Sequence, residues 1–193
     1  MKISFIGAGR VAHHLAKAFS PQHQIVDVYS RSIASAQALA DQVAARAVTS
    51  AQDLNPEIDI AIIAVSDQAI EAVVRDIGVY LRKVCLVHTS GSTAMQLLSA
   101  VHDRVGVFYP LQTFSFESVI DWSNTPLLIE AQYPADEKQL LQLAQQMSQR
   151  VYVYSSEQRL SLHLAAVFAC NFSNYCFDMA QQIVDAQQVD FSL

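Results

Sequence analysis

The sequence has few of the residues that dominate fibrous, disulfide-rich or nucleic-acid-binding proteins. Its 193 residues include five glycines, five prolines and three cysteines, and 12 basic residues stand against 18 acidic ones, for a net charge of −6. So few glycines and prolines exclude collagen-like and low-complexity chains. The acidic balance argues against a protein that binds nucleic acid or a membrane surface, because both functions require basic patches.

The cysteines and the short hydrophobic runs indicate the cellular compartment of the protein. Cys85, Cys170 and Cys176 form an odd, scattered set without a Cys-x-x-Cys pair, which is typical of reduced, buried thiols. The longest apolar runs, Ile60–Val65 and Leu164–Cys170, fall far short of the roughly 20 residues that span a bilayer. The N-terminus does not have the pattern of a signal peptide. We therefore expect a cytoplasmic protein.

Strand and helix patterns alternate along the first 154 residues. The run Ile60–Val65 is continuously apolar, as in a central parallel strand that is covered on both faces. Alternating strands and helices imply right-handed crossovers, so the sequence predicts an α/β fold with a doubly wound, mostly parallel sheet. The expected strands are Lys2–Ile6, Gln24–Tyr29, Arg46–Thr49, Asp59–Val65, Val84–His88, Val105–Phe108, Leu127–Glu130 and Val151–Tyr154. The expected helices are Arg10–Phe19, Ile33–Val43, Gln68–Leu81, Thr93–Ala100 and Ala135–Gln149.

The composition changes after residue 154. Residues 157–188 contain no glycine or proline and favour one long helix of some 30 residues, about 45 Å at 1.5 Å per residue. Its apolar residues cover most of the circumference, and such a helix is buried on most sides. We therefore expect a dinucleotide-binding domain at 1–154 and a partial helical domain at 155–193 that forms a homodimer. The chain stops at Asp190-Phe191-Ser192-Leu193, where another helix is expected to begin, so it looks like a fragment.

A glycine-rich turn follows the first expected strand. Gly7-Ala8-Gly9-Arg10-Val11-Ala12 leads into the first helix, which brings free backbone N–H groups and the positive end of the helix dipole together. Gly7 permits the tight turn, Gly9 lets phosphate oxygens approach the backbone, and Ala12 takes the helix-packing position. The pattern predicts a pyrophosphate site in a Rossmann-like fold. The alternative is a glycine turn in an α/β protein that binds no nucleotide.

The end of the second expected strand indicates which dinucleotide is bound. A carboxylate that accepts hydrogen bonds from the ribose 2′-hydroxyl is typical of NAD sites, and here Ser30-Arg31-Ser32 takes its place. The planar guanidinium of Arg31 can pair with a 2′-phosphate while both serine hydroxyls donate to it. This predicts NADP. In the alternative reading, Arg31 is a solvated cation and Ser32 only caps the helix Ile33–Val43.

Polar segments follow three further strands, where ligands bind in open α/β sheets. After the fourth strand, Ser66 is placed to line the dinucleotide groove, whereas Asp67 is better explained as a helix cap. After the fifth, Ser90 is placed where nicotinamide and substrate should meet, whereas His88 at the end of that strand is more often structural than catalytic. After the sixth strand come Gln112 and Thr113, which could bind a polar group. The aromatic residues around this third segment are expected to serve as lid and core packing: Phe108, Tyr109, Phe114 and Phe116.

Three polar residues interrupt the long apolar helix. His163, Asn171 and Asn174 share one broad face of a regular α-helix at 100° per residue. Buried polar groups need hydrogen-bond partners. Either the three bond to neighbouring backbone, or they face the cleft, where His163 can act as a general acid and Asn171 can orient substrate.

In this order, the motifs resemble one particular family. The chain is similar to the 6-phosphogluconate dehydrogenase and pyrroline-5-carboxylate reductase superfamily, and within it to the NADP oxidoreductase branch, deazaflavin-dependent NADP oxidoreductase-like, with a C-terminal domain of unknown function. The lysine that 6-phosphogluconate dehydrogenase-type enzymes carry on the long helix has no counterpart, and His163 occupies that region. The matching stretches are Gly7–Ala12, Ser30–Ser32, Ala64–Ile70, His88–Ser92, Tyr109–Phe114 and His163–Asn171.

These observations predict an NADP(H)-dependent oxidoreductase that moves hydride to or from a small polar carbonyl or imine substrate. The alternative is a non-catalytic NADPH-binding sensor, and a flavin or deazaflavin as hydride partner is a subsidiary possibility. Scattered histidines and the absence of a carboxylate cluster argue against a metal site. The candidate catalytic residues are His163, Ser90 and Asn171. The candidate cofactor-binding residues are Gly7, Ala8, Gly9, Arg10, Val11, Ala12, Ser30, Arg31, Ser32, Val65, Ser66 and His88.

Overall fold

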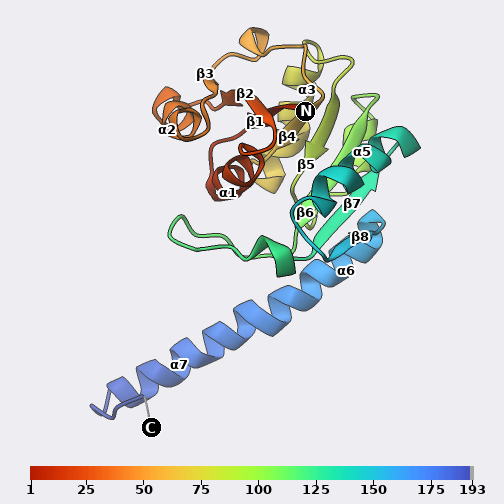
Figure 1. Ribbon diagram of the computed structural model, residues 1–193. Helices are drawn as coiled ribbons and strands as arrows, with labels where there is room; N and C mark the ends of the chain where they lie inside the picture. The colour runs from red at the N-terminus through yellow and green to blue at the C-terminus, as the bar shows by residue number, and fades with distance from the viewer. Residues whose placement is uncertain (192–193) are drawn as a thin grey trace.

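Eight strands form one sheet in the order β3-β2-β1-β4-β5-β6-β7-β8, in a computed structural model that describes residues 1–191 (Figure 1). All neighbouring strands are parallel except β6 and β7, which are antiparallel. The predicted α/β fold with a mostly parallel sheet is therefore confirmed. The strands are β1 Lys2–Ile6, β2 Gln24–Tyr29, β3 Arg46–Val48, β4 Ile60–Ile63, β5 Cys85–His88, β6 Val105–Pro110, β7 Leu127–Ala131 and β8 Val151–Val153.

Helices cover both faces of this sheet because its central strands are apolar on both sides. Successive residues of a strand point to opposite faces. Phe5 and Ile62 accordingly pack with α1, α2 and α5 on one face, whereas Ile6 and Ile63 pack with α3 and α4 on the other. The helices are α1 Arg10–Phe19, α2 Ile33–Val43, α3 Ile70–Gly78, α4 Gln96–Ser99 and α5 Pro134–Gln145, with short 3₁₀ turns at Ala51–Asp53, Asp67–Ala69 and Trp122–Asn124.

The predicted long helix is present and runs away from the sheet as one rod (Figure 1). It consists of α6 Ser156–Ala166, a π-helical turn Val167–Phe172 and α7 Ser173–Asp185. A capping box starts it, because the Ser155 hydroxyl accepts the Gln158 N–H while the Gln158 side chain accepts the Ser155 N–H. Leu162 packs against the buried cluster of Val107, Tyr109 and Leu128. Most other large apolar side chains from Leu160 onward are exposed in the single chain: Leu160, Leu164, Phe168, Phe172, Tyr175, Phe177, Met179 and Ile183.

Several details differ from the sequence predictions. The helix expected from Thr93 begins only at Gln96, since the Thr93 N–H is held by the Ser90 hydroxyl and the Met95 N–H by Ser156. Cys85 is buried as expected, but Cys170 and Cys176 are exposed, because they lie on the projecting helix; the expectation of buried thiols is wrong for these two. Ser192 and Leu193, the last residues of the predicted C-terminal domain, lie outside the described residues. Within residues 1–191, no helix combines the length and the apolar character needed to cross a membrane.

Candidate functional site

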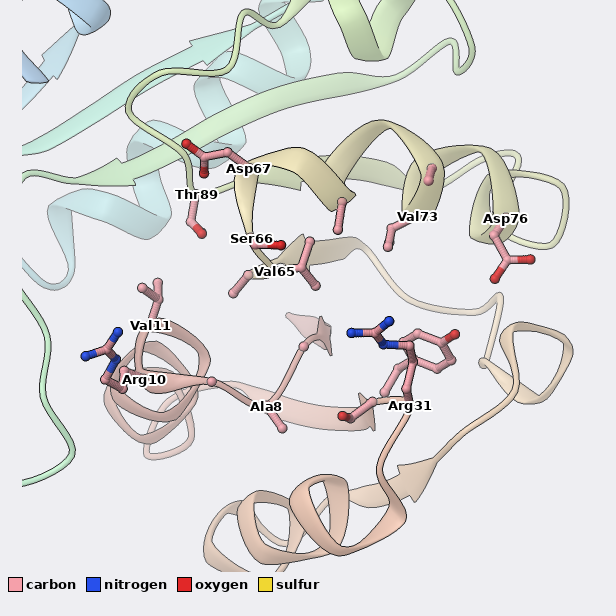
Figure 2. A pocket seen from close by; sticks show the side chains of 17 residues that line it. Ala8, Arg10, Val11, Arg31, Val65, Ser66, Asp67, Val73, Asp76 and Thr89 are labelled. Carbon is pink, nitrogen blue, oxygen red and sulfur yellow. The ribbon is translucent and has the colours of Figure 1, made fainter.

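A cavity of about 750 Å³ opens where the carboxyl ends of β1, β2 and β4 meet (Figure 2). Parallel strands bring their carboxyl ends to one edge of the sheet, and this edge is where ligands bind in doubly wound folds. Helix α3 forms one wall of the cavity and the start of α1 another. The lining residues are Gly7, Ala8, Gly9, Arg10, Val11, Tyr29, Ser30, Arg31, Ala64, Val65, Ser66, Asp67, Ala69, Ala72, Val73, Asp76 and Thr89.

The two glycines of the β1–α1 turn have different tasks. Gly7 has φ +111°, and a Cβ there would lie 2.3 Å from the Ala64 carbonyl oxygen, so only glycine fits between β1 and β4. A Cβ at Gly9 would meet nothing within 4 Å, because this position faces open space. Gly9 precedes α1 without a side-chain cap, and the first turn of α1 carries no acidic residue. The helix terminus therefore fits a pyrophosphate group.

Arg31 and Ser30 line the cavity beyond this turn, as a site for a 2′-phosphate requires. The Arg31 guanidinium extends from the end of β2 toward α3, which carries Asp76 (Figure 2). Burial and then the Asp76 charge raise the pKa of Tyr29, whereas Arg31 opposes this shift. Both charges therefore act on the same part of the cavity.

Ser32, Ala12 and His88 are not among the cavity-lining residues. The Ser32 hydroxyl caps α2 by accepting the Ser35 N–H at 3.3 Å, and Ala12 is buried against the core. His88 is also buried, and its Nδ1 accepts the Ser90 N–H at 3.1 Å. Burial, and then the nearby Arg159 charge, lower the pKa of His88 to about 3, so its imidazole is neutral. Thr89, the next residue, lines the cavity.

A second group of polar residues adjoins the cavity at the loop that follows β5. The Ser90 hydroxyl accepts the N–H groups of Ser92 and Thr93 at 3.1 and 3.0 Å, and so shapes this loop. The Ser92 hydroxyl donates to the Asp67 carboxylate at 2.5 Å. Because Asp67 also lines the cavity, this hydrogen bond joins the dinucleotide cavity to the loop.

His163 lies directly against this loop. Its Nδ1 is 2.9 Å from the Tyr109 hydroxyl, and the two rings meet edge to face with centroids 5.9 Å apart. A Cβ on Gly91 would lie 2.6 Å from His163 Nδ1 and 2.8 Å from Tyr109 Cζ, so the pair packs on the bare glycine. Burial, more than any nearby charge, raises the pKa of Tyr109 to about 12. The structure thus brings His163 to the Ser90 loop and adds Tyr109, which sequence reasoning treated only as packing.

Asn171 and Asn174 do not join this group in the single chain. Both are exposed on the projecting helix, and Asn171 is eight residues beyond His163, about 12 Å along a helix axis. The expectation of a shared face assumed 100° per residue throughout. The π-helical turn Val167–Phe172 breaks that spacing, because its hydrogen bonds span five residues instead of four.

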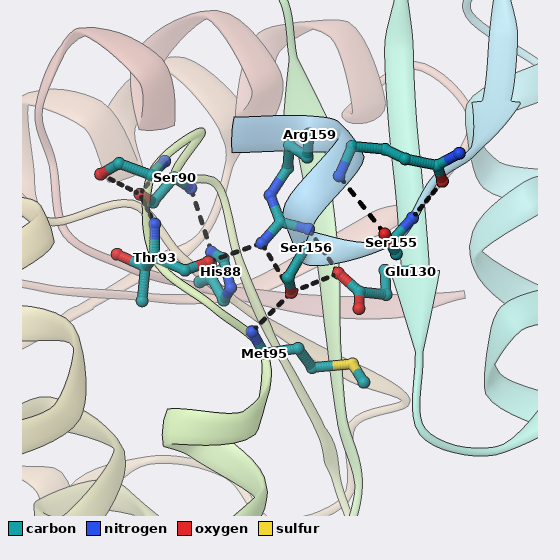
Figure 3. A network of polar contacts seen from close by, with 10 residues as sticks. His88, Ser90, Thr93, Met95, Glu130, Ser155, Ser156 and Arg159 are labelled. Atoms are coloured by element: carbon teal, nitrogen blue, oxygen red, sulfur yellow. Dashed lines mark hydrogen bonds and ion pairs between the residues drawn. The ribbon is translucent and has the colours of Figure 1, made fainter. Parts of the chain in front are cut away.

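A buried ion pair holds the start of the long helix in place (Figure 3). Arg159 is 1% exposed, and its guanidinium donates to the Glu130 carboxylate on β7 and to the Thr93 carbonyl at 2.5 Å. The Ser156 hydroxyl donates to Glu130 at 2.8 Å and accepts the Met95 N–H at 2.9 Å. Arg159 lies one helical turn before His163, so this network sets the position of the imidazole. Nothing in the sequence pointed to it.

Two family descriptions match successive parts of the chain. Residues 2–90 match "NADP oxidoreductase coenzyme F420-dependent", and residues 125–193 match "Domain of unknown function (DUF2520)". No curated protein matches the chain.

Solved structures extend this similarity to nearly the whole chain. The "putative NADP oxidoreductase BF3122" of Bacteroides fragilis is 39% identical, with a TM-score of 0.89 over 99% of this chain and 74% of that one. An imine reductase from Myxococcus stipitatus in complex with NADP⁺ is 20% identical, with a TM-score of 0.75 over 100% of this chain and 68% of that one. The 1-pyrroline-5-carboxylate reductase of Streptococcus pyogenes is 15% identical, with a TM-score of 0.73 over 100% and 73%. At such low identity the last two show the fold alone.

Proposed function

Because the chain belongs to the family of NADP oxidoreductases that join an F420-dependent-type NADP domain to a DUF2520 domain, we propose that it reduces a C=O or C=N bond of a small polar substrate with NADPH. The observation that carries this proposal is the position of His163. Its imidazole packs on Gly91, two residues after Thr89, which lines the dinucleotide cavity. A proton donor and a hydride donor would therefore reach the same substrate.

Different cavity residues are proposed to bind different groups of the cofactor. The N–H groups of the Gly7–Val11 turn would face the pyrophosphate, and the Arg31 guanidinium, with the Ser30 hydroxyl, would hold the 2′-phosphate. Val65 and Ser66 line the path between the pyrophosphate and the Ser90 loop. This order runs along the sheet edge from β2 to β5, so the nicotinamide end would lie beside Thr89.

The chemistry needs one hydride and one proton. NADPH, when bound in the cavity, would supply the hydride for the substrate carbon and would be oxidised to NADP⁺. The protonated imidazole of His163 would give its proton to the oxygen or nitrogen of the former double bond and become neutral, which balances the reduction. The loop shaped by Ser90 orients the substrate. Asn171 lies apart from this arrangement in the single chain, and its catalytic role stays a prediction.

The partner of this protein is a second copy of the chain. The apolar side chains exposed along α6 and α7 support this part of the proposal, because large exposed apolar patches mark interaction surfaces. Light scattering after size exclusion tests it. A dimer mass that falls to the monomer mass in Phe168→Glu supports the proposal, and a monomer mass for the wild type contradicts it.

Calorimetric titration with NADPH and NADH tests the cofactor site. We expect NADPH to bind more tightly, and Arg31→Ala to weaken NADPH by at least about tenfold, or about 1.4 kcal/mol. Arg82→Ala is the matched control, because it removes an exposed arginine outside the cavity. Equal affinities of the wild type for NADPH and NADH would contradict the assignment of Arg31.

Turnover tests the chemistry. NADPH oxidation is followed with a cyclic imine and a keto acid as probes. His163→Gln should lower turnover by roughly a hundredfold, while its affinity for NADPH stays near that of the wild type. Tight NADPH binding without oxidation by either probe would favour the alternative of a sensor. Unchanged turnover in His163→Gln would remove His163 from the mechanism.

A further inference from the structure

Tyr109 and His163 form a pair that is enclosed from three elements. Tyr109 comes from β6 and is nearly buried, His163 comes from α6 and is half-buried, and the β5 loop closes over them at Gly91. The hydroxyl-to-Nδ1 distance of 2.9 Å is that of a good hydrogen bond. The pair therefore has a fixed geometry before any ligand arrives.

The direction of this hydrogen bond follows from the chemistry of the two groups. A phenol carries one O–H, and a buried O–H needs an acceptor. Within residues 1–191, His163 Nδ1 is the hydrogen-bond partner found for the Tyr109 hydroxyl. The raised pKa of Tyr109 keeps the phenol protonated. In neutral His163, Nδ1 therefore accepts, and the ring proton lies on the other nitrogen, Nε2.

We propose that Tyr109 is a positioning residue that fixes the tautomer of His163, so that Nε2–H is the group presented to the substrate heteroatom. The proposal rests on the proposed reductase function for its use in catalysis, though not for its geometry. When His163 is protonated, the Tyr109 hydroxyl rotates and accepts from Nδ1–H, because a hydroxyl both donates and accepts. Nε2 thus bears a hydrogen in both charge states.

Gly91 helps to position the same imidazole ring. A Cβ at this position would lie 2.6 Å from Nδ1 and 2.7 Å from Cγ of His163, and no real contact of that kind is that short. Only a glycine lets the imidazole approach the loop while it keeps its bond to Tyr109. The bare backbone at Gly91 thereby fixes the ring position, and the phenol fixes its hydrogen.

The ring nitrogens of His163 test the proposal directly. The full chain is labelled with ¹⁵N in its histidine rings, and nitrogen–proton correlation spectra are recorded in alkaline buffer without NADPH or substrate. We expect Nδ1 of His163 to be unprotonated and Nε2 protonated. In Tyr109→Phe both resonances should shift toward the mixture of tautomers found in free imidazole. Tyr80→Phe, which removes an exposed hydroxyl, should leave them unchanged.

Two outcomes would overturn the proposal: a protonated Nδ1 in the wild type, or a Tyr109→Phe spectrum identical to that of the wild type. The His102 ring reports the fold, since its Nε2 bonds to the Val84 carbonyl elsewhere in the molecule. If Tyr109→Phe does not fold, Gly91→Ala should give the same shift with the phenol intact. In the reductase assay, Tyr109→Phe should lower turnover at least roughly tenfold with unchanged NADPH affinity. The spectra need no cofactor, so loss of the reductase hypothesis would leave them interpretable.

Discussion

The sheet region, residues 1–154, and the long helix of α6 to α7 follow opposite rules of burial. In the sheet region the large apolar residues are buried, and Phe5 and Phe108 are 0% exposed. In the long helix the best-buried side chain is Arg159, whereas Phe168 and Phe177 are 64% exposed. Charged residues are almost never fully buried unless they are paired. The helix is thus attached to the sheet mainly by polar contacts, and most of its large apolar side chains are exposed in the single chain.

This difference separates two sources of stability. Apolar burial stabilises the sheet region, at roughly 25 cal/mol per Å² of buried surface. The attachment of the helix depends largely on the hydrogen bonds around the Arg159–Glu130 ion pair, beside the contacts of Leu162 and His163 with Tyr109. Substitutions that open a cavity should therefore destabilise the sheet region. Substitutions that remove a charge of the ion pair should destabilise the attachment of the helix.

The largest expected effect comes from breaking the buried ion pair. Glu130→Ala leaves the buried Arg159 guanidinium without its counter-charge, which should lower the free energy of unfolding by about 3–5 kcal/mol. The measurement is urea denaturation. Glu71→Ala is the matched control, because it breaks an exposed pair with Arg75 that should be worth less than about 1 kcal/mol. Similar losses of unfolding free energy in the two variants would contradict the expectation that the buried ion pair stabilises the protein more than the exposed one.

A pair of phenylalanine truncations compares the two regions directly. Phe108→Ala opens a cavity in the core and should cost about 3–5 kcal/mol of unfolding free energy. Phe177→Ala removes an exposed ring and should cost no more than about 0.5 kcal/mol at low protein concentration. The check is urea denaturation at two protein concentrations. Equal costs at the lower concentration would contradict the distinction.

Acid should weaken the sheet region through His88. The pKa of His88 is about 3 in the folded chain and about 6.5 when unfolded, so the unfolded state binds more protons between these values. The stability that this group contributes is present above pH 6.5 and is lost as the pH falls toward 3, by about 1.4 kcal/mol per unit. Denaturation at several pH values measures the slope. His88→Gln should make the free energy of unfolding less dependent on pH. An unchanged slope would show that groups other than His88 cause the pH dependence.

The smallest predicted effect concerns the cavity. Asp76 brings a negative charge to the part of the cavity that Arg31 lines, so Asp76→Asn should tighten NADPH binding by about two- to fivefold. The effect should be largest at low salt, because salt screens exposed charges. Calorimetry measures it, with Asp41→Asn on α2, outside the cavity, as control. Weaker binding in Asp76→Asn would show that this carboxylate contacts the cofactor.

The sequence predicted the parts of the molecule that depend on local signals. Helices α1 and α2 begin and end at the predicted residues, because a glycine turn precedes one and Ser32 caps the other. The fold class and the long helix were also confirmed. Ser30 and Arg31 line the cavity, and the roles of the individual site residues stay predictions.

Local sequence signals could not predict contacts between residues that lie far apart in the sequence. Glu130 and Arg159 are 29 residues apart, and Tyr109 and His163 are 54 apart, so no spacing rule links them. All four residues of β5 are buried, including His88 at its end, and Thr89 is the first residue beyond the strand and lines the cavity. The π-helical turn was missed because the sequence was read with one fixed angle per residue.

The π-helical turn Val167–Phe172 also determines how far α7 is rotated about the helix axis relative to α6. Each residue added to or removed from a regular helix rotates everything beyond it by about 100°. The helix before the turn is oriented by Arg159, and the helix after it inherits its direction through a turn of different pitch. A single deletion within Val167–Phe172 would therefore re-aim the whole apolar surface of α7, while His163 and the dinucleotide cavity stayed where they are.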